Sequence, residues 1–297
     1  MFSRHDVLSA FKGGLGLGLL GSGLGLAQAY APAQVNVHRA HLPGLNTPLR
    51  VALLSDLHYG RFIGLPQVRA WVSRALTTRA DVILVLGDLV ELDLRRSWPD
   101  DFLNELARLQ APLGVFGIWG NHDYGSFGVW THPPEHNDKS WSALRDEFHA
   151  ALARRGLRVL RNEGLLLRPD LYLGGVDDLY WGHPDAEAAL RNAPEPVDAA
   201  RLLMSHNPDY LMHLPPTVGL VLSGHTHGGQ VRLPIIGAPV APSEYGQRFA
   251  QGWVRGGLSG DGARGFVSRG LGLTGLPFRN LCTSEIVVLD LQPEAAR

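Results

Sequence analysis

Residues 218–230 read VGLVLSGHTHGGQ, an apolar run followed by Ser223, Gly224 and the histidine pair His225 and His227. The run has the length and composition of a buried strand. Alternate side chains of a strand share a face, so the two histidines are expected to point to the same side. The pair predicts either one edge of a metal site or a strand end whose histidines hydrogen-bond a loop.

Four other apolar runs also end in side chains of the types that bind metals. The runs at 50–55, 82–86, 115–119 and 202–205 are predicted strands, and the residues at these ends, with the histidine pair, are Asp56, His58, Asp88, Asn121, His122, His206, His225 and His227. Ligand sites of α/β sheets lie beyond the carboxyl ends of the strands. One such stretch can occur by chance, but five together predict a single shared site.

The chemistry of these side chains limits the choice of metal. Imidazole nitrogens outnumber oxygens, which argues against magnesium and calcium, and the set lacks the thiolates of a structural zinc site. Carboxylate, imidazole and one amide oxygen suit ions of intermediate softness. The set therefore predicts divalent manganese, iron or zinc.

The composition is that of a globular protein with a full core. The 297-residue chain is 45% hydrophobic and 19% charged, which excludes an intrinsically disordered chain. Its net charge of -1 gives no general attraction to nucleic acid, so we expect no nucleic-acid binding. The one cysteine, Cys282, can form no intramolecular disulfide and is expected to be a small packed side chain.

Residues 1–33 are predicted to be an export signal or a membrane anchor. A run rich in glycine, leucine and alanine extends from Gly13 to Ala27, and Ala27-Gln28-Ala29 offers a small-x-small cleavage site. The run is shorter than the roughly 20 residues of a standard membrane span. Its start resembles a twin-arginine signal with His5 in place of the second arginine. We expect a protein exported across the cytoplasmic membrane or associated with it; the alternative is a glycine-rich helix packed on the domain.

The remaining chain, residues 34–297, is predicted to form a single α/β domain. Amphipathic helices are expected from Pro66, from Pro99 to Leu109 and after Asp138, alternating with strands in the βαβ order. The second half is richer in short strands, expected at 158–161, 165–167, 171–176, 266–268 and 285–291. No internal repeat and no break in composition divides this part of the chain.

The order of the motifs resembles a known superfamily. Asp-x-His, Gly-Asp-x-x-Glu, Gly-Asn-His-Asp, His-Asn-Pro and Gly-His-Thr-His follow one another across residues 50–230 as in the calcineurin-like metallophosphoesterases. The residues at 55–58, 206–209, 223–230 and 267–272 are similar to a bacterial group of exported or membrane-anchored phosphodiesterases. The resemblance implies a four-layer α-β-β-α sandwich and hydrolysis of a phosphoric ester.

The resemblance also implies a role for each motif residue. Asp56, His58 and His227 would hold one divalent ion, Asn121, His206 and His225 the other, and Asp88 would bridge the two. A hydroxide shared by the two ions would attack phosphorus in line. His122 follows a ligand without being one, and it would act as the general acid on the leaving oxygen.

Two motif positions depart from the wider family. Glu91 stands where an aspartate commonly orients the catalytic histidine, so we expect Glu91 to hydrogen-bond His122. Leu92 stands where phosphoprotein phosphatases carry an arginine, which favours a diester or a small ester as substrate. Arg269 and Arg279 lie in loops similar to the group's C-terminal pattern, and they are expected either to bind phosphate or to lie at the solvated surface.

Two further stretches lie near these motifs. Tyr124, Phe127 and Trp130 are expected to form an apolar wall for a lipid or nucleoside, or to pack their own loop. Asp177 and Asp178 follow a glycine pair and are interpreted as turn residues.

Together these features predict a dinuclear-metal-dependent phosphoesterase acting on a phosphodiester or a small phosphate ester, including a phospholipid-like one. One alternative is a lipid-linked nucleotide-sugar pyrophosphatase of the UDP-2,3-diacylglucosamine type, favoured if the N-terminal segment is an anchor. A second alternative is a non-catalytic metal-binding scaffold of the same fold. A scaffold has no physical need for seven ligands and an unliganded His122, so an enzyme is preferred.

Overall fold

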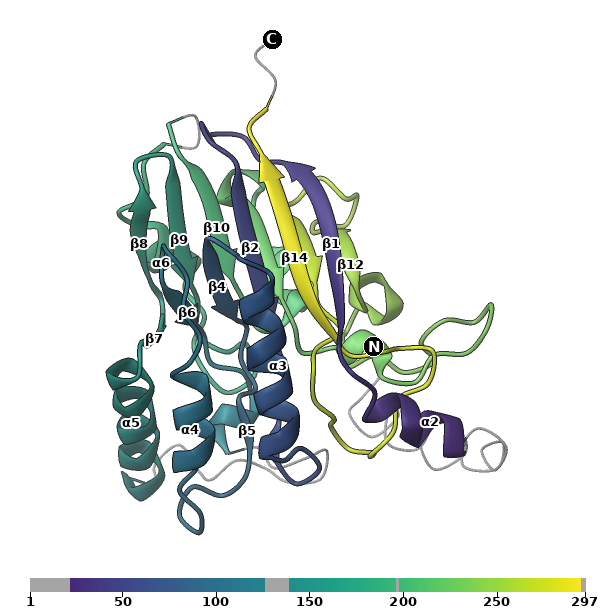
Figure 1. The fold of residues 1–297 in the computed structure, drawn as a ribbon. Helices are drawn as coiled ribbons and strands as arrows, with labels where there is room; N and C mark the ends of the chain where they lie inside the picture. The colour runs from purple at the N-terminus through teal and green to yellow at the C-terminus, as the bar shows by residue number, and fades with distance from the viewer. Residues whose placement is uncertain (1–21, 126–138, 196–197, 295–297) are drawn as a thin grey trace.

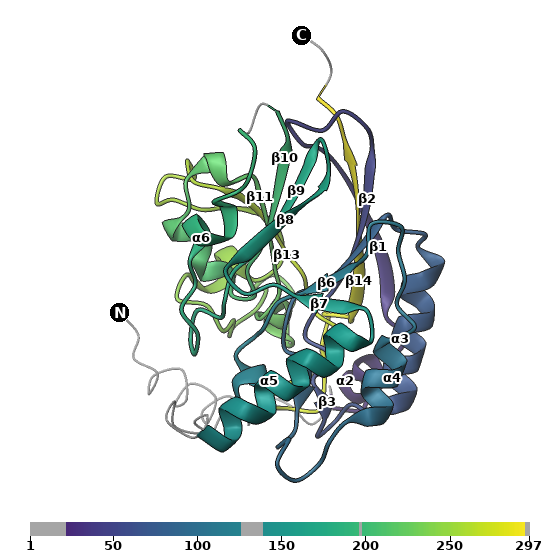
Figure 2. The ribbon, with the colours of Figure 1, turned by 90° about the vertical axis from the view of Figure 1, so that its left-hand side faces the viewer.

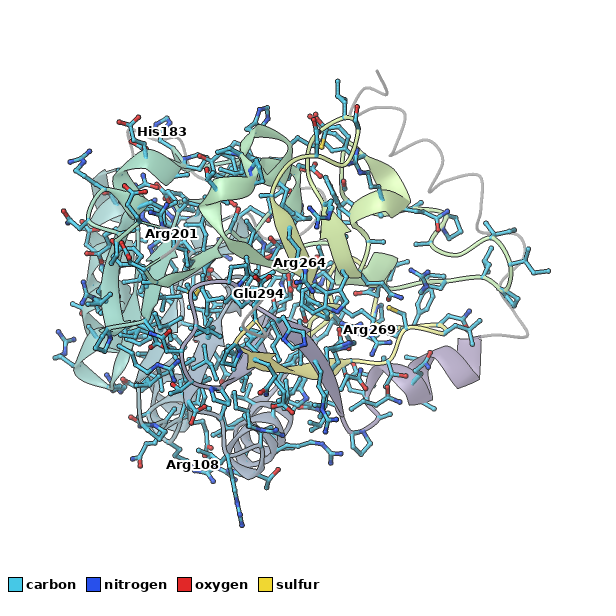
Figure 3. The ribbon with its side chains drawn as sticks, turned by 90° about the horizontal axis from the view of Figure 1, so that it is seen from above. Arg108, His183, Arg201, Arg264, Arg269 and Glu294 are labelled. Atoms are coloured by element: carbon cyan, nitrogen blue, oxygen red, sulfur yellow. The ribbon has the colours of Figure 1, made fainter. Side chains whose placement is uncertain are left out.

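Two six-stranded sheets lie face to face in the computed structural model, which describes residues 22–125, 139–195 and 198–294. Figure 2 shows the sheets edge-on, with helices on the outer side of each. Arg108 follows a helix that covers the first sheet, and His183 precedes a helix that covers the second. Seen from above (Figure 3), these two residues lie on opposite sides of the molecule. The predicted four-layer α-β-β-α sandwich is confirmed.

The first sheet carries the βαβ half of the chain. Its order is β1 (Gln34–His41), β14 (Glu285–Gln292), β2 (Leu49–Leu54), β4 (Val82–Val85), β6 (Val115–Gly117) and β7 (Leu157–Val159). The strands β2, β4, β6 and β7 are parallel, and β14 is antiparallel to β2. Helices α3 (Leu65–Thr77), α4 (Asp100–Leu106) and α5 (Lys139–Arg154) connect them. Asp138, the expected start of α5, lies outside the described residues.

The second sheet comes mainly from the second half of the chain. Its order is β12 (Gly252–Arg255), β13 (Arg264–Val267), β11 (Leu220–Ser223), β10 (Ala200–Met204), β9 (Leu171–Gly175) and β8 (Glu163–Arg168). The inner four strands are parallel and the two edge strands are antiparallel to their neighbours. Its outer face carries α6 (Ala186–Leu190) and the 3-10 helices η3 (Pro208–His213), η4 (Pro216–Val218) and η6 (Gly246–Phe249).

Short elements complete the edge at which the central strands end. Two two-residue strands, β3 (Tyr59–Gly60) and β5 (Val90–Glu91), pair with each other beyond β2 and β4. The 3-10 helices η2 (His122–Tyr124) and η5 (His227–Gly229) follow β6 and β11. These short elements lie within or next to the loops that carry the predicted site residues.

The central strands are apolar throughout because both of their faces are covered. In β2, Val51 and Leu53 enter the core between the sheets, whereas Ala52 and Leu54 pack against the helices. Alternate side chains of a strand point to opposite faces, so a strand between two layers needs apolar residues at every position. This packing aligns the carboxyl ends of strands from both sheets.

The end of the predicted N-terminal segment packs on the domain. Helix α2 (Ser22–Ala29) accepts a hydrogen bond at the Gly25 carbonyl from the Arg279 amide at 3.1 Å, and Ala29 and Ala33 are buried. Residues 22–33 therefore contact the domain, while residues 1–21 lie outside the described residues. Among the residues that the structure describes, no helix has the length and apolarity that a membrane crossing requires.

Candidate metal centre

Polar side chains from both sheets meet at the carboxyl ends of five strands. Strands β2, β4, β6, β10 and β11 are followed by Asp56 and His58, Asp88, Asn121 and His122, His206, and His225 and His227 respectively. None of these eight residues is more than 7% exposed. Buried carboxylates and imidazoles need charged or polar partners, so their concentration here indicates a site for a cation.

Backbone hydrogen bonds hold the motif loops together. The Asp56 amide donates to the Gly87 carbonyl and the His58 amide donates to the Asp88 carbonyl, both at 3.0 Å. These bonds join the loops after β2 and β4. The His225 amide donates to Oδ1 of Asp56 at 2.9 Å and so links the second sheet to the first. The positions of the side chains are therefore fixed by the fold.

The backbone at the site adopts an unusual conformation. Asp56, His58, Asp88, His225 and His227 all have positive φ, between 47° and 70°. Residues other than glycine rarely adopt this conformation, and it costs free energy that the surrounding structure must offset. Such strain concentrates at functional sites, where it turns side chains toward a common point.

The glycines that precede two of the motif residues leave room for the carboxylates. A Cβ atom at Gly224 would lie 2.5 Å from Oδ2 of Asp56, and one at Gly120 would overlap Oδ1 of Asp88. A larger residue at either position would displace a carboxylate from the site. The glycines are therefore part of the geometry of the motifs.

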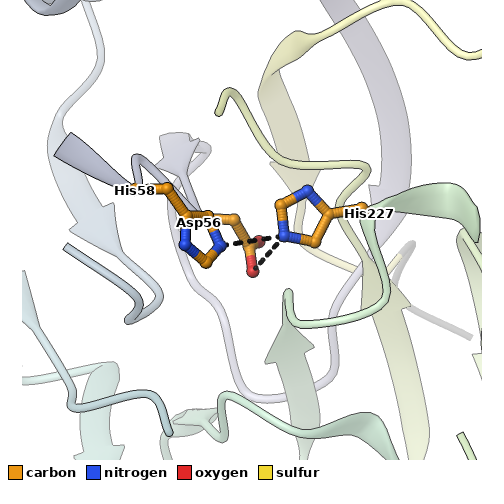
Figure 4. Close-up of side chains that lie close together, drawn as sticks. All are labelled: Asp56, His58 and His227. Carbon is orange, nitrogen blue, oxygen red and sulfur yellow. Dashed lines mark hydrogen bonds and ion pairs between the residues drawn. The ribbon is translucent and has the colours of Figure 1, made fainter. Parts of the chain in front are cut away.

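Figure 4 shows the first group of converging donors, Asp56, His58 and His227. Nε2 of His58 lies 3.0 Å from Nε2 of His227, which lies 3.5 Å from Oδ1 of Asp56. All three donor atoms are within 4.8 Å of one another. Two imidazole nitrogens and a carboxylate directed at one point form a metal-binding arrangement.

A second group consists of Asp88, His206 and His225, whose donor atoms also lie within 4.8 Å of one another. Oδ2 of Asp88 lies 3.2 Å from Nε2 of His206 and 3.5 Å from Nε2 of His58, so it faces both groups. Oδ1 of Asn121 and Nε2 of His225 are buried and have no hydrogen-bond partner among the described residues. Buried polar atoms normally have a partner, and a metal ion bound by these two ligand atoms would supply one.

His122 lies close enough to the donors to form a third group with His58 and Asp88. Its amide donates to Oδ1 of Asp88 at 2.8 Å, whereas its Nδ1 is buried without a partner in the described part of the chain. The rings of His122 and His58 meet edge to face, with centroids 4.5 Å apart. Its position permits contact with either a metal ion or a substrate.

Burial and charge divide the histidines into two kinds. Burial lowers the pKa of His225 to about 3, and burial together with neighbouring charge holds those of His58 and His227 well below the ordinary value. Burial also opposes the protonation of His206, but the Asp88 carboxylate overcomes it and raises the pKa of His206 to about 10. Metals bind the neutral form of imidazole. His58, His225 and His227 are therefore already in the metal-binding form, whereas His206 must first lose a proton.

Glu91 occupies a different place from the expected one. Its Oε2 lies 3.6 Å from Nδ1 of His58, and no hydrogen bond or ion pair joins Glu91 to His122 within the described residues. Burial and the nearby charge of Asp88 raise the pKa of the Glu91 carboxyl to about 7. The pairing of β5 with β3 brings Glu91 alongside the loop of His58, and this tertiary contact is the reason for the difference.

The two C-terminal arginines are bound within the protein. Arg279 is fully buried, and its guanidinium donates to the carbonyls of Cys282, Arg269, Gly270 and Gly272 at 2.8 to 3.2 Å. The expectation of a solvated surface role for Arg279 is therefore wrong, because the carbonyls of its own loop fold around its guanidinium. Its Nη2 also lies 3.4 Å from Nδ1 of His227. Arg269 pairs with Glu285 at 2.7 Å.

Asp123 organises the site, although it was not among the residues predicted from the sequence. Asp123 is buried, and its carboxylate accepts hydrogen bonds from the amides of Leu89 at 2.9 Å, Val90 at 3.3 Å and Gly120 at 2.9 Å. It thereby joins the loops after β4 and β6. Its position in the Gly-Asn-His-Asp motif was the available signal.

The stretch after β9 lies deeper than its turn composition indicates. Asp178 accepts hydrogen bonds from the Tyr180 and Trp181 amides, as a turn residue does, but it is fully buried, and burial raises its pKa to about 7. Asp177 is also buried and accepts from the Tyr124 hydroxyl. Tyr124 is therefore buried and bonds to the loop after β9, while Phe127 and Trp130 lie outside the described residues.

Comparison with known proteins agrees with the motifs and the fold. Residues 49–229 match the family model described as calcineurin-like phosphoesterase. The chain is 27% identical over 298 residues to the uncharacterized metallophosphoesterase YkuE of Bacillus subtilis, covering 98% of both proteins. It is 31% identical over 255 residues to phosphodiesterase YaeI of Escherichia coli, covering 82% of each.

A longer animal protein is also similar. The transmembrane protein with metallophosphoesterase domain of Bos taurus is 31% identical over 222 residues, which are 68% of this chain and 45% of that protein. The similarity thus lies in the domain that carries the motifs. Because the family model covers most of the chain and includes all the strand ends that meet at the site, the protein belongs to the calcineurin-like phosphoesterase family, a family of metal-dependent phosphoric ester hydrolases.

Proposed function

We propose that the protein is a dinuclear-metal-dependent phosphoesterase that hydrolyses a phosphodiester or a small phosphate ester. The observation that carries the proposal is the position of Asp88, whose Oδ2 faces both His58 of the first donor group and His206 of the second. Two cations held side by side repel each other, and a shared carboxylate offsets that repulsion.

The residues divide between the two ions as follows. Asp56, His58 and His227 hold one, Asn121, His206 and His225 hold the other, and Asp88 lies between them. The mixture of imidazole and oxygen donors suits manganese, iron or zinc. Bound divalent ions supply Lewis acidity, which lowers the pKa of coordinated water and offsets charge on the phosphoryl oxygens.

His122 is assigned to the leaving oxygen of the substrate. Burial lowers the pKa of its imidazole against the opposing effect of the Asp88 carboxylate, which favours the neutral ring. An anionic phosphate beside the ring would favour its protonated form, because opposite charges at close range stabilise each other. A proton delivered from the ring to the departing alkoxide avoids the release of a strong base.

The substrate class is proposed as a diester or small ester. Leu92 leaves the site without the arginine that the phosphoprotein phosphatases carry, and the similar protein from Escherichia coli is named a phosphodiesterase. The lipid-linked nucleotide-sugar pyrophosphatase remains the alternative within the same chemistry. For the N-terminal segment, residues 1–33, we propose a role in export or membrane association.

A metal and substrate screen tests the proposal. Chelated protein should be inactive, and manganese, iron or zinc should restore hydrolysis of a model diester with two ions bound per chain. Monoesters and a nucleotide-sugar pyrophosphate, assayed in parallel, separate the substrate classes. A protein that binds the ions but hydrolyses none of these esters would be the non-catalytic scaffold, and a single bound ion would exclude the dinuclear centre.

A further inference from the structure

Large apolar side chains are exposed on one part of the molecule. Six of the nine exposed large hydrophobic residues of the described chain come from three segments, and they are Leu26, Tyr30, Leu233, Ile235, Ile236 and Leu281. Ile235 is the most exposed of the nine. Single exposed apolar residues are common, but a group of them marks a surface that contacts something other than water.

Backbone hydrogen bonds show that the three segments adjoin one another. The Arg279 amide donates to the Gly25 carbonyl of α2 at 3.1 Å, and the Arg232 amide donates to the Asn280 carbonyl at 2.8 Å. The loop at 276–281 therefore joins α2 to the segment at 231–242. We call these three segments the apolar face. In Figure 1, α2 lies at the end of the molecule where β2 and β4 finish, so the apolar face is at the same end as the metal centre.

The apolar face has almost no charge. Residues 233–242 read LPIIGAPVAP and residues 270–278 read GLGLTGLPF, and neither stretch contains a charged side chain. The chain leading into α2 is also uncharged from residue 13 to residue 37. Within the apolar face the charged side chains are Arg232 and the fully buried Arg279. Surface loops in water are normally polar, so three adjoining segments with so little charge indicate an apolar environment.

The most exposed part of this face is a built hairpin. Leu233 and Gly237 exchange backbone hydrogen bonds at 2.7 and 2.9 Å, and the Gln247 side chain bonds to the backbone of Ile236 and Ala238. Ile235 at its tip has a φ of 67°, which a β-branched residue adopts only under strain. The fold thus stabilises a conformation that holds two isoleucines away from the core.

We propose that the apolar face binds the interfacial region of a phospholipid bilayer, with Ile235 and Ile236 inserted among the acyl chains. The N-terminal sequence argues for this occupant, because the apolar run that begins at Gly13 leads directly into α2. Any attachment of that run to a membrane would bring the hairpin against the same surface. Arg232, next to the hairpin, is placed to meet lipid phosphates.

The proposal concerns the folded domain and does not depend on the catalytic assignment. It predicts two contacts with the membrane, one from the N-terminal run and one from the hairpin, as stable membrane attachment generally requires. It also predicts that the metal centre lies at the membrane-facing end of the molecule, because α2 and the carboxyl ends of β2 and β4 are at that same end.

Fluorescent labels on the full-length protein test the proposal directly. The native Cys282 is fully buried, so a cysteine introduced by Ile235→Cys can carry an environment-sensitive fluorophore. The matched control is Leu258→Cys, at the second most exposed of the nine residues, which precedes β13 and so lies at the other end of that strand from the metal centre. Unsubstituted protein measures any labelling of Cys282.

With vesicles of phosphatidylcholine and phosphatidylglycerol, the label at 235 should shift to shorter wavelength and be quenched by spin-labelled lipid, whereas the label at 258 should not. The double variant Ile235→Asp and Ile236→Asp should lower the vesicle-bound fraction about tenfold or more. Hydrolysis of a water-soluble ester should be unchanged. An unquenched label at 235 on vesicle-bound protein overturns the proposal, as does a concentration-dependent shift without lipid, which would identify a second copy as the occupant.

Discussion

Oε2 of Glu91 lies 3.6 Å from Nδ1 of His58, at the edge of the ring opposite the Nε2 atom that faces Asp88 and His227. At 3.6 Å these two atoms form no hydrogen bond, and both are buried without another partner among the described residues. A carboxylate in this place orients a metal-binding imidazole and increases its basicity once the two atoms come within hydrogen-bond distance. The structure therefore connects Glu91 to the metal centre through His58, whereas the motif alone connected it to the catalytic histidine.

The first prediction concerns Glu91→Gln. The substitution should weaken metal binding at the Asp56, His58 and His227 group by about 10 to 100-fold, the usual effect of losing a carboxylate that supports a ligand. Competition with a chelator measures the affinity. Glu105→Gln, which alters a carboxylate of α4 paired with Arg69 and Arg108, is the control. Unchanged metal affinity with a leaving-group-dependent loss of rate would return Glu91 to its expected role beside His122.

The second prediction concerns His122→Ala. Both ions should remain bound while turnover falls by about 10² to 10⁴-fold, the usual contribution of a positioned acid. An ester that releases a stabilised phenolate should lose less activity than one that releases an aliphatic alkoxide. Metal analysis and rates with two such esters test this. His183→Ala, a substitution outside the site, should change neither, and loss of an ion from His122→Ala would make His122 a ligand.

The third prediction concerns the residue between the donor groups. Asp88→Asn removes the charge that both ions share, so it should lower the occupancy of both. The asparagine amide is nearly the same size as the aspartate carboxylate, so any loss of metal reports the lost charge and not a change in packing. Metal content after dialysis is the measurement. Full retention of the second ion in the variant would show that Asp88 serves one ion only.

The fourth prediction concerns pH. In the metal-free protein, the Asp88 carboxylate raises the pKa of His206 to about 10 against the effect of burial, and burial raises that of Asp56 to about 6. Metal ions must displace both protons, so affinity should fall as pH falls. We expect about tenfold per pH unit between pH 9 and 7, and a steeper fall below pH 6. Calorimetric titrations at several pH values measure it, and an affinity independent of pH would contradict both assignments.

The fifth prediction concerns Arg279→Met. The variant should lose about 3 kcal/mol or more of unfolding free energy, because buried carbonyls that its guanidinium now satisfies would be left unpaired. Arg269→Met, which removes one ion pair with Glu285, should cost less. Denaturant unfolding of both variants measures the difference. Equal stability, with substrate affinity reduced only by Arg279→Met, would indicate a phosphate-binding arginine.

Local pattern predicted the βαβ order of the first half and the candidate site residues at the strand ends, whereas the four layers were implied by the resemblance to a known superfamily. The run at 50–55 is apolar at every position because β2 is covered on both faces, and this signal is present in the sequence itself. Parallel strands end at one edge of a sheet, so the residues after β2, β4 and β6 had to lie near one another. The same reasoning placed the residues after β10 and β11.

The sequence by itself therefore determined the order of strands and helices, the motifs whose resemblance implied the α-β-β-α layers, and the types of side chain at the strand ends. Only the tertiary structure decided which atoms face each other: Glu91 meets His58 through the pairing of β3 and β5, and Arg279 is enclosed by carbonyls of its own loop. It also brought the three segments of the apolar face together at the metal-centre end of the molecule. Strand periodicity repeats over neighbouring residues, whereas the contacts of Glu91 and Arg279 depend on the conformations of loops, which no periodic pattern specifies.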